Sequence, residues 1–555
     1  MFDKSISRRA FLAASAAAVS LFPLDWQRIA AFAARMGPKS DYPTVIIGAG
    51  LGGLCCGAYL AKQGIPVTVV EQSDHPGGYA CSFDRAGGKF TFDVSLHGTP
   101  IRDNAAARVL QELGVLQSLT LIELPEIYYL KTPDLSISLP QRDPEEYIRR
   151  LSEHFPAEKE GIQAFIRKIV QIAEEGDRLH REGMGPELLF PLRYFELYAV
   201  LDKTLAQVMN AYVKDPALQN ILASLWDFHG LPPSKVSGLY YAAAKGDSLR
   251  NGTYYVKHRS SDLSDALVKT IQAAEGQVRF NCAVERILVK DETVSGVQLA
   301  DGETISARAV VSNANALDTF NRMLPPEIVP KDYLSALKTY RPSLSTFIVW
   351  LGLNQDIRQW IEAAGIQVLS RQGPEADYQS CLNGDAAKVP FRISVYDNIY
   401  DGYSRPGTST VRVFCLSAYK PWEQFEADYR AGRKKAYHEE KKKWADILLR
   451  RAEEILPGLS SAIESQVAAT PLTNWRYTRN PEGAIYGFEQ IVDNAYLDRM
   501  ANKSPVKGLY LAGAWSSPGG GFSGVLVGGQ MAFQEMMAAW SASTPADRAQ
   551  PTGGK

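Results

Sequence analysis

Glycines at fixed spacing follow a short apolar run near the start of the chain and indicate a phosphate-binding turn. The run Val45-Ile46-Ile47 leads into Gly48-Ala49-Gly50-Leu51-Gly52-Gly53, a Gly-x-Gly-x-x-Gly pattern, and then into a helix-like segment. Gly48 allows a tight turn, Gly50 lets the backbone approach a pyrophosphate, and Gly53 lets the helix pack closely on the strand. The helix N-terminus then presents free N–H groups and a partial positive charge to the phosphates.

An acidic residue after the next apolar run supports this interpretation. Ile65 to Val70 is typical of a second strand, and Glu71 follows it, 21 positions beyond Gly50. An acid at this distance meets a ribose 2′-OH in dinucleotide-binding units. The two features together predict that the chain binds a dinucleotide.

Two further glycine-rich segments have the form of ligand-binding loops. His75-Pro76-Gly77-Gly78-Tyr79 comes just after Glu71, and paired glycines let a backbone press against a phosphate or a flat ligand. Near the other end, a strand ending at Gly513 is followed by a loop from Pro518 to Gly524 and a helix start. A second helix N-terminus is therefore expected to face the ligand.

The size and charge of the chain restrict its class. Its 555 residues suffice for two or more domains with a large buried core. Lys plus Arg number 60 and Asp plus Glu 61, so the net charge is −1 and no nucleic-acid partner is expected. The six cysteines contain no Cys-x-x-Cys pattern and the seven histidines show no metal-ligand spacing. Neither a disulfide framework nor a metal site is expected.

The N-terminal segment has the features of an export signal. Ser7-Arg8-Arg9-Ala10-Phe11-Leu12 precedes an alanine-rich apolar run, which is typical of a twin-arginine signal covering residues 1–35. The signal predicts that the protein is exported and works in the periplasm or on the outer face of the cytoplasmic membrane. An ordinary basic and apolar terminus is the alternative.

Several quoted motifs together resemble those of the FAD-dependent superfamily of phytoene desaturases, carotenoid isomerases and retinol saturases. The resemblance covers most of the chain after about residue 42. It rests on the glycine turn, the Pro76-Gly77-Gly78 loop and these further segments: Phe92-Asp93-x-x-x-His97, Val284-Glu285-Arg286-Ile287, Trp475-Arg476-Tyr477, Gly483-Ala484-Ile485-Tyr486-Gly487 and the C-terminal Pro-Gly-Gly-Gly block. The set is specific for the superfamily and much less specific for one activity within it.

The resemblance implies an α/β fold in which a Rossmann-like FAD-binding domain is interleaved with a mixed α+β substrate domain. We assign residues 42–130, 250–320 and 470–540 to the FAD-binding domain. Residues 131–249 and 321–469 would form the substrate domain, and residues 541–555 a disordered tail.

The resemblance also implies where FAD lies. Gly48, Gly50 and Gly53, with the intervening Leu51 and Gly52, would hold the pyrophosphate, and Glu71 with Gln72 the adenosine ribose. The remaining predicted contacts are Gly77, Gly78 and Tyr79 along the ribityl and flavin side, Val284 at adenine through its backbone, and Gly513, Ala514, Gly521, Gly524 and Val525 facing ribityl and isoalloxazine.

Two departures from related sequences stand out. Many related flavoproteins carry an acid where this chain has Ala514, which weakens an amine-oxidase interpretation. The family commonly has a glycine-rich loop before the helix at about Leu263, where this chain has Tyr254 to Ser261. Two interpretations of this difference are open: a changed entrance to the substrate site, or a simple substitution at the surface.

The expected chemistry is hydride and proton movement at a carbon–carbon bond of a hydrophobic substrate, with FAD carrying the redox step. His97 is the candidate catalytic residue because its pKa class suits proton transfer. A structural histidine bonded to backbone is the alternative, and Asp93 is interpreted as a loop-tying residue.

The inserted regions suit a hydrophobic substrate. They are rich in aromatic residues, which suit either the wall of a polyene tunnel or an ordinary core. Pro186 to Leu201 is apolar, so a membrane-dipping lid and a buried helix both remain open. The basic run from Arg433 to Lys443 is interpreted as a solvated helix face rather than a site for an anionic partner.

Three functions fit these observations. The first is an FAD oxidoreductase or isomerase acting on C=C bonds of an isoprenoid or polyene lipid. The second is an FAD oxidase of another substrate, such as an amine, and the third a non-catalytic flavin- or lipid-binding protein. A membrane quinone is the expected electron partner, since an exported enzyme lacks the cytoplasmic NADPH pool.

Overall fold

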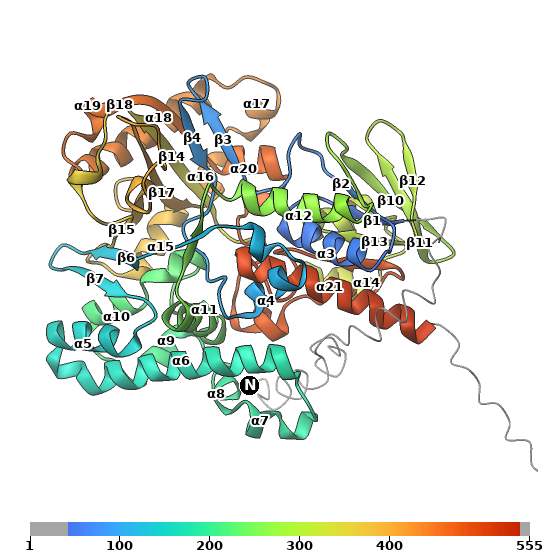
Figure 1. Cartoon of the computed structure of the whole chain (residues 1–555), viewed down its shortest axis with the longest axis horizontal. Coiled ribbons are helices and arrows are strands. Elements are labelled where there is room, and N and C mark those ends of the chain that lie inside the picture. Colours follow the sequence, from blue (N-terminus) through green and yellow to red (C-terminus); the bar gives the residue numbers. More distant parts are fainter. Residues whose placement is uncertain (1–42, 544–555) are drawn as a thin grey trace, which may run out of the picture.

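The computed structural model describes residues 43–543 and contains two large sheets (Figure 1). The first sheet is parallel throughout, in the order β19-β13-β1-β2-β9. Its strands are β1 (Thr44–Ile47), β2 (Val67–Val70), β9 (Gln277–Arg279), β13 (Ala309–Ser312) and β19 (Leu509–Leu511). Every residue of β1, β2 and β13 is buried, as expected of a parallel sheet covered on both faces.

Helices cover one face of this sheet and a small sheet covers the other. Ile46 points into a core shared with α3 (Leu51–Lys62), α12 (Ser261–Ala273) and α21 (Phe522–Ser543). Its neighbours Val45 and Ile47 point into a second core shared with the antiparallel sheet of β10 (Val284–Lys290), β11 (Thr293–Leu299) and β12 (Thr304–Ser306). This alternation is the period of two expected for a strand. The arrangement confirms the predicted Rossmann-like domain.

The second sheet has seven strands in the order β18-β14-β17-β16-β15-β6-β7. Its bounds are β6 (Glu126–Lys131), β7 (Ser136–Pro140), β14 (Ser345–Leu353), β15 (Gly365–Val368), β16 (Phe391–Val395), β17 (Ser409–Ser417) and β18 (Ile463–Ala469). All neighbours are antiparallel except β15 and β6. Because β6 belongs to this sheet, the boundary assigned at residue 130 falls inside one of its strands.

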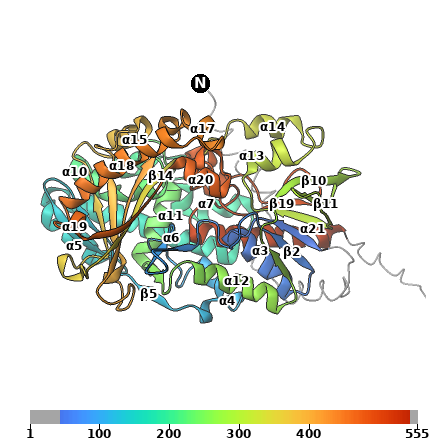
Figure 2. The ribbon, with the colours of Figure 1, turned by 90° about the horizontal axis from the view of Figure 1, so that it is seen from above.

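Helices from two parts of the chain pack around the second sheet (Figures 1 and 2). The first group is α5 (Pro144–His154), α6 (Lys159–Glu182), α7 (Phe190–Arg193), α8 (Phe195–Tyr198), α9 (Leu205–Met209), α10 (Pro216–Leu222) and α11 (Gly238–Asn251). The second group is α15 (Pro374–Asn383), α16 (Lys420–Glu423), α17 (Glu426–Arg430), α18 (Lys435–Glu453), α19 (Leu459–Ala462) and α20 (Pro471–Thr478). Asp143 caps α5 and Pro144 occupies its first turn.

The remaining elements connect the two domains. A hairpin of β3 (Ser82–Arg85) and β4 (Phe90–Asp93) leads from the first glycine-rich region to the second sheet. The others are α4 (Ala105–Glu112), β5 (Leu121–Glu123) paired with β8 (Tyr254–Val256), α13 (Ala316–Asp318) and α14 (Lys331–Leu337).

Both ends of the chain extend beyond the described residues. The twin-arginine segment lies outside the described residues. The disordered tail predicted for residues 541–555 is wrong for its first three residues, because α21 continues through Ser543, and its other residues lie outside the described part. Among residues 43–543, no helix combines the length and the hydropathy that crossing a membrane requires.

Candidate functional site: a glycine-lined cavity between the two domains

The predicted phosphate-binding turn opens α3 without a side-chain cap. Gly48 has a φ of +95°, and α3 begins at Leu51 with no capping hydrogen bond and no acid in its first turn. Its first N–H groups are therefore left for a ligand, as at an anion-binding helix N-terminus. A Cβ on Gly52 would lie 2.7 Å from the backbone N of Gly513, so only glycine fits where these two segments meet.

Asn313, at the end of β13, lies at the centre of these glycines. Its backbone N–H donates to Ile47 O (2.9 Å) and its side-chain amide donates to Gly48 O (3.3 Å). A Cβ on Gly50 would come within 2.8 Å of its Nδ2 and one on Gly513 within 2.4 Å of its Oδ1. Asn313 thus joins the two glycine segments across the sheet. The sequence did not indicate this role, because Asn313 follows an ordinary apolar strand.

Glu71 directly follows β2, and its buried carboxylate fixes the turn. Its side chain accepts hydrogen bonds from the backbone N–H groups of Ala49 (2.7 Å) and Ser73 (2.9 Å). Its backbone carbonyl accepts from Cys282 N (2.7 Å), which brings the segment before Val284 alongside. Val284 lines the same cavity. The predicted ribose and adenine contacts therefore lie together.

The second and third glycine segments close the other sides of the cavity. Gly77 N–H donates to Ala49 O (2.8 Å), so the Pro-Gly-Gly loop lies directly on the first turn. The Tyr79 hydroxyl donates to Ala484 O (3.3 Å). The start of α21 faces the cavity from the opposite side, and a Cβ on Gly529 would meet Gly52 O at 2.4 Å. Two helix N-termini are thereby held close to one ligand space.

The cavity measures about 1290 Å³, and almost every predicted cofactor residue lines it. Those on its wall are Gly48, Gly50, Leu51, Gly52, Glu71, Gln72, Gly77, Gly78, Tyr79, Val284, Gly513, Ala514, Gly521, Gly524 and Val525. Gly53 is not among them. A Cβ there would meet Gly48 O at 2.3 Å, so Gly53 serves the helix–strand packing. The uncapped start of α3, the start of α21 on the cavity wall and the space left by the missing glycine Cβ atoms fit FAD, and these residues would hold it.

His97 lies on the cavity wall beyond the glycine segments. Its ring packs edge-on against Phe228 and Phe414, each at 5.2 Å between centroids. Its Nδ1 is 2.7 Å from Nη2 of Arg412, in the middle of β17. A guanidinium only donates, so Nδ1 accepts and the imidazole hydrogen sits on Nε2. His97 therefore offers the cavity a hydrogen-bond donor.

Burial and two guanidinium groups keep His97 neutral. Burial lowers the pKa of His97 well below its usual value, and the positive charges of Arg412 and Arg392 lower it further. Arg392 lies on neighbouring β16, pairs with Asp227 and stacks over Phe228 at 3.6 Å from the ring centroid. These partners were missed from the sequence, although a single arginine inside each apolar strand was the available signal.

Asp93 holds the loop that carries His97. Its buried carboxylate accepts from the backbone N–H groups of Ser95 (3.2 Å), Leu96 (3.0 Å) and Ser260 (2.8 Å). It also accepts from the hydroxyl groups of Ser260 (3.0 Å) and Tyr255 (3.2 Å). The interpretation of Asp93 as a loop-tying residue is confirmed.

The Tyr254–Ser261 segment, where the resemblance leads us to expect a glycine-rich loop, carries larger side chains in this protein. His258 and Arg259 have φ values of 65° and 84°, the left-handed region that favours glycine. Arg259 is buried and donates to Thr91 O (3.1 Å) and Tyr403 O (3.2 Å). The segment is anchored to the neighbouring β4 and to the loop at Tyr403.

The fold and site define a dinucleotide-binding flavoprotein, and comparison with known proteins gives its family. Residues 51–537 match the family of flavin-containing amine oxidoreductases, and the chain belongs to that family. It is an FAD oxidoreductase.

Curated relatives cover most of the chain at low identity. Prolycopene isomerase of Daucus carota is 25% identical over 521 residues, covering 91% of this chain and 81% of the relative. All-trans-retinol 13,14-reductase of Danio rerio is 26% identical, covering 85% of this chain and 82% of the relative. Phytoene desaturase of Rhodobacter capsulatus is 27% identical, covering 90% of this chain and 95% of the relative.

Solved structures agree on the fold. An oxidoreductase from Methanosarcina mazei aligns with a TM-score of 0.59 and 17% identity, covering 88% of this chain and 99% of that one. Cyclohexylamine oxidase from Brevibacterium oxydans aligns with a TM-score of 0.57 and 15% identity, covering 90% and 99%.

Gly52→Ala should weaken both FAD binding and folding. The added methyl group meets backbone at Gly513, and such overpacking costs about 1–3 kcal/mol. FAD per chain after gel filtration and the thermal midpoint measure the two effects. Gly57→Ala on the same helix is the matched control, because its Cβ meets only the side-chain ends of Ile271, Ile46 and Val69. Full FAD content and unchanged stability in Gly52→Ala would contradict the packing argument.

His97 should make stability depend on pH. Because its pKa is lowered on folding, the folded chain binds fewer protons than the unfolded chain below about pH 6.5. As the pH falls from about 7 to about 5, the free energy of unfolding of the wild type should decrease. The decrease should be smaller in His97→Gln, by up to about 2 kcal/mol. Chemical denaturation at both pH values measures this difference. Equal losses in the two proteins would show that His97 is not a buried neutral imidazole.

Proposed function

We propose that this FAD oxidoreductase acts on C=C or C–C bonds of a hydrophobic isoprenoid or polyene substrate, as a desaturase, saturase or isomerase. The observation that carries the proposal is the continuity of the cavity. From the glycine segments it extends to a wall of apolar and aromatic side chains formed by Tyr128, Phe228, Ile348, Trp350 and Phe414. A long apolar molecule can lie along this wall with one end at the cofactor. The names of the curated relatives support the same substrate class.

Charge near His97 disfavours an amine as substrate. Arg412 is buried and has no carboxylate within salt-bridge distance among the described residues, whereas Asp227 neutralises Arg392. A substrate ammonium entering this region would meet uncompensated positive charge in a medium of low dielectric constant. A neutral polyene meets no such cost, so the electrostatics favour it over the amine alternative.

FAD, when bound, supplies the acceptor or donor for hydride, and the protein supplies position and environment. The glycine turns bind its phosphates, and the aromatic wall excludes water. His97 does not abstract a proton through Nδ1, because Arg412 occupies that atom. Its Nε2–H is placed to donate a hydrogen bond to the substrate.

Organic extraction of the purified protein tests the substrate class. We expect mass spectrometry to detect an isoprenoid or polyene carried through purification from the native host, with FAD retained on washing. Primary amines should give no turnover with peroxide release. A clean extract, or amine turnover, would overturn the lipid assignment. Loss of flavin on mild washing would favour a binding protein instead.

The proposal includes a location at a membrane surface. The Ser7–Leu12 motif supports export, and a membrane quinone is the proposed electron partner. The segment from Leu188 to Phe195 supports surface contact: Leu188 is 90% exposed, Leu192 79% and Phe195 63%. Such an apolar group on a protruding element is typical of interfacial insertion.

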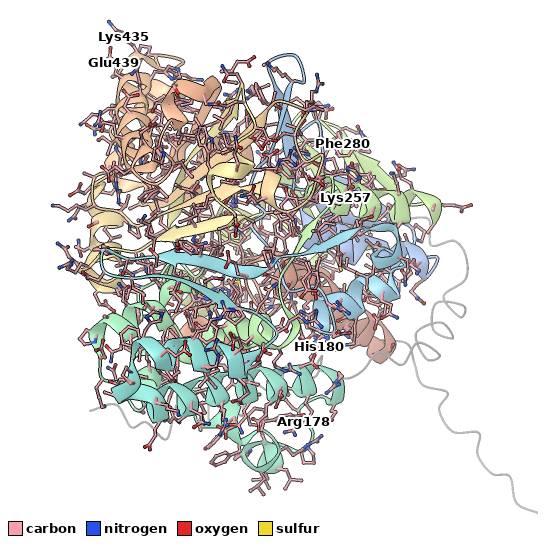
Figure 3. All side chains as sticks on the ribbon, turned by 60° about the vertical axis from the view of Figure 1, so that its left-hand side comes forward. Arg178, His180, Lys257, Phe280, Lys435 and Glu439 are labelled. Atoms are coloured by element: carbon pink, nitrogen blue, oxygen red, sulfur yellow. The ribbon has the colours of Figure 1, made fainter. Side chains whose placement is uncertain are left out.

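The exposed segment is held rigidly. Tyr194 is buried and its hydroxyl donates to Gly183 O (2.6 Å), while the Glu175 carboxylate accepts from the backbone N–H groups of Glu196 (2.8 Å) and Leu197 (3.0 Å). The adjacent end of α6 lines the cavity through Ala173, Gly176, Asp177, Leu179 and His180. His180 and Arg178 are labelled in Figure 3. His180 lines the cavity, whereas Arg178 lies over the ring of Tyr194, between α7 and α8. A lipid at this surface would therefore lie close to the cavity.

The triple variant Leu188→Ser, Leu192→Ser and Phe195→Ser should lose affinity for phosphatidylcholine vesicles by at least about tenfold, because each apolar side chain contributes more than 1 kcal/mol on burial. Flotation of the full chain with vesicles measures this affinity. Leu192→Met with Phe195→Leu is the control and should bind like the wild type. Unchanged flotation of the serine variant would contradict membrane contact through this segment.

A further inference from the structure

Cations without acidic partners line the cavity where α18 and α20 meet. They are Lys434, just before α18, Lys441 within it, and Arg476 and Arg479 at the end of α20. Among the described residues, none of the four has a carboxylate within salt-bridge distance. We call this region the α18–α20 groove.

Each of these cations lies over an aromatic ring. The distances from the charged group to the ring centroid are 4.6 Å for Lys434 over Tyr429, 5.5 Å for Lys441 over Tyr437, 5.4 Å for Arg476 over Tyr477 and 4.8 Å for Arg479 over Trp475. The rings position the charges and provide flat surfaces beside them. Lys441 Nζ donates one hydrogen bond, to Ala468 O (3.0 Å), and its ammonium group has two further hydrogens to donate. Tyr477 is 56% exposed, so the groove opens to solvent.

Lysines elsewhere on α18 behave differently. Lys442 pairs with Asp446 at 2.6 Å and Lys443 pairs with Glu440 at 3.6 Å, and neither lysine lines the cavity. Figure 3 shows Lys435 and Glu439 of the same helix at its outer side. Acids of α18 therefore pair with Lys442 and Lys443 on its solvent side, whereas Lys441 on the groove side has no acidic partner among the described residues. The prediction of a solvated helix face for Arg433 to Lys443 therefore describes Lys442 and Lys443, but not Lys434 and Lys441, which line the cavity.

The nearby acids on the cavity wall do not balance this charge. Asp74 contacts His75 at 2.7 Å, and Asp318 contacts Arg322 at 3.5 Å. The like charges also act on one another: burial and the neighbouring Lys434 both lower the pKa of Lys441. An uncompensated cluster of this kind is costly in the free protein and is suited to binding an anion.

We propose that the α18–α20 groove binds the phosphate group of a phosphate-bearing ligand. Lysine and arginine are the side chains that bind phosphate, and the flanking rings suit a ligand with an apolar or planar part. Two sources of the phosphate share this chemistry: the head of an isoprenoid phosphate and the phosphates of a nucleotide. The isoprenoid source rests on the proposed function, because its chain would lie along the aromatic wall.

FAD's own phosphates have a separate place. The glycine turns that would hold them come from β1, β19 and the segments beside them, whereas the groove is formed by α18 and α20. The two are adjacent, since Gln72 donates to Tyr477 O at 3.1 Å. Flavin content is therefore the measurement that separates a second site from the cofactor site.

The test compares the FAD-loaded wild type with Lys434→Gln/Lys441→Gln and with the control Lys442→Gln/Lys443→Gln. Calorimetry at low salt measures binding of geranylgeranyl phosphate, NADPH and inorganic phosphate. We expect the wild type to bind at least one organic phosphate, the groove variant to bind it about tenfold more weakly or worse, since it loses charged hydrogen bonds, and the control to match the wild type. All three proteins should contain the same amount of FAD.

The outcomes separate the alternatives. Binding of geranylgeranyl phosphate alone assigns the groove to the substrate, and binding of NADPH alone assigns it to an electron donor and replaces the proposed quinone. No binding of either by the wild type overturns the groove proposal, as does equal weakening in the control. A loss of FAD from the groove variant overturns it as well, because the cations would then belong to the cofactor site. None of these binding results depends on polyene turnover.

Discussion

The close packing of backbone around Asn313 is the constraint on which the rest of the site depends. Gly50, Gly52 and Gly513 lie against this one side chain or against each other at distances that leave no room for a Cβ, and Gly48 has the positive φ that the turn requires. This packing brings the N-termini of α3 and α21 to the same space, although the two helices start about 470 residues apart in the chain. A dinucleotide site can form there because α3 begins without a side-chain cap and the start of α21 lies on the same cavity wall.

From this anchor, the second domain determines what can reach the cofactor. The β3–β4 hairpin leads from the glycine loop to the second sheet, and Asp93 at its end fixes the His97 loop. Arg412 and Arg392, from neighbouring strands, keep the imidazole neutral at the aromatic wall. The cavity therefore combines a polar end for the cofactor with an apolar region for a substrate, and its outer end at α18 and α20 is positively charged.

The sequence predicted the parts whose signal is local. The glycine spacing, Glu71 and the apolar runs of β1, β2 and β13 each lie within a few residues, so composition and period reveal them. Asn313 and Arg412 were missed because their roles arise from contacts with distant residues: Arg412 meets His97 across 315 positions. The exposure of Leu188 and Leu192 was equally undetermined, because apolar residues in that segment surround buried Phe190 and Tyr194 as well.

Anaerobic mixing of the FAD-loaded protein with candidate substrates tests the central claim, that this cavity couples FAD to a neutral isoprenoid. Absorbance at the flavin band follows the redox state of the bound cofactor directly. We predict that an isoprenoid or polyene changes that absorbance, starting from either the oxidised or the photoreduced protein, and that primary amines leave it unchanged. Reduction of the flavin by an amine, with no response to any polyene, would contradict the account.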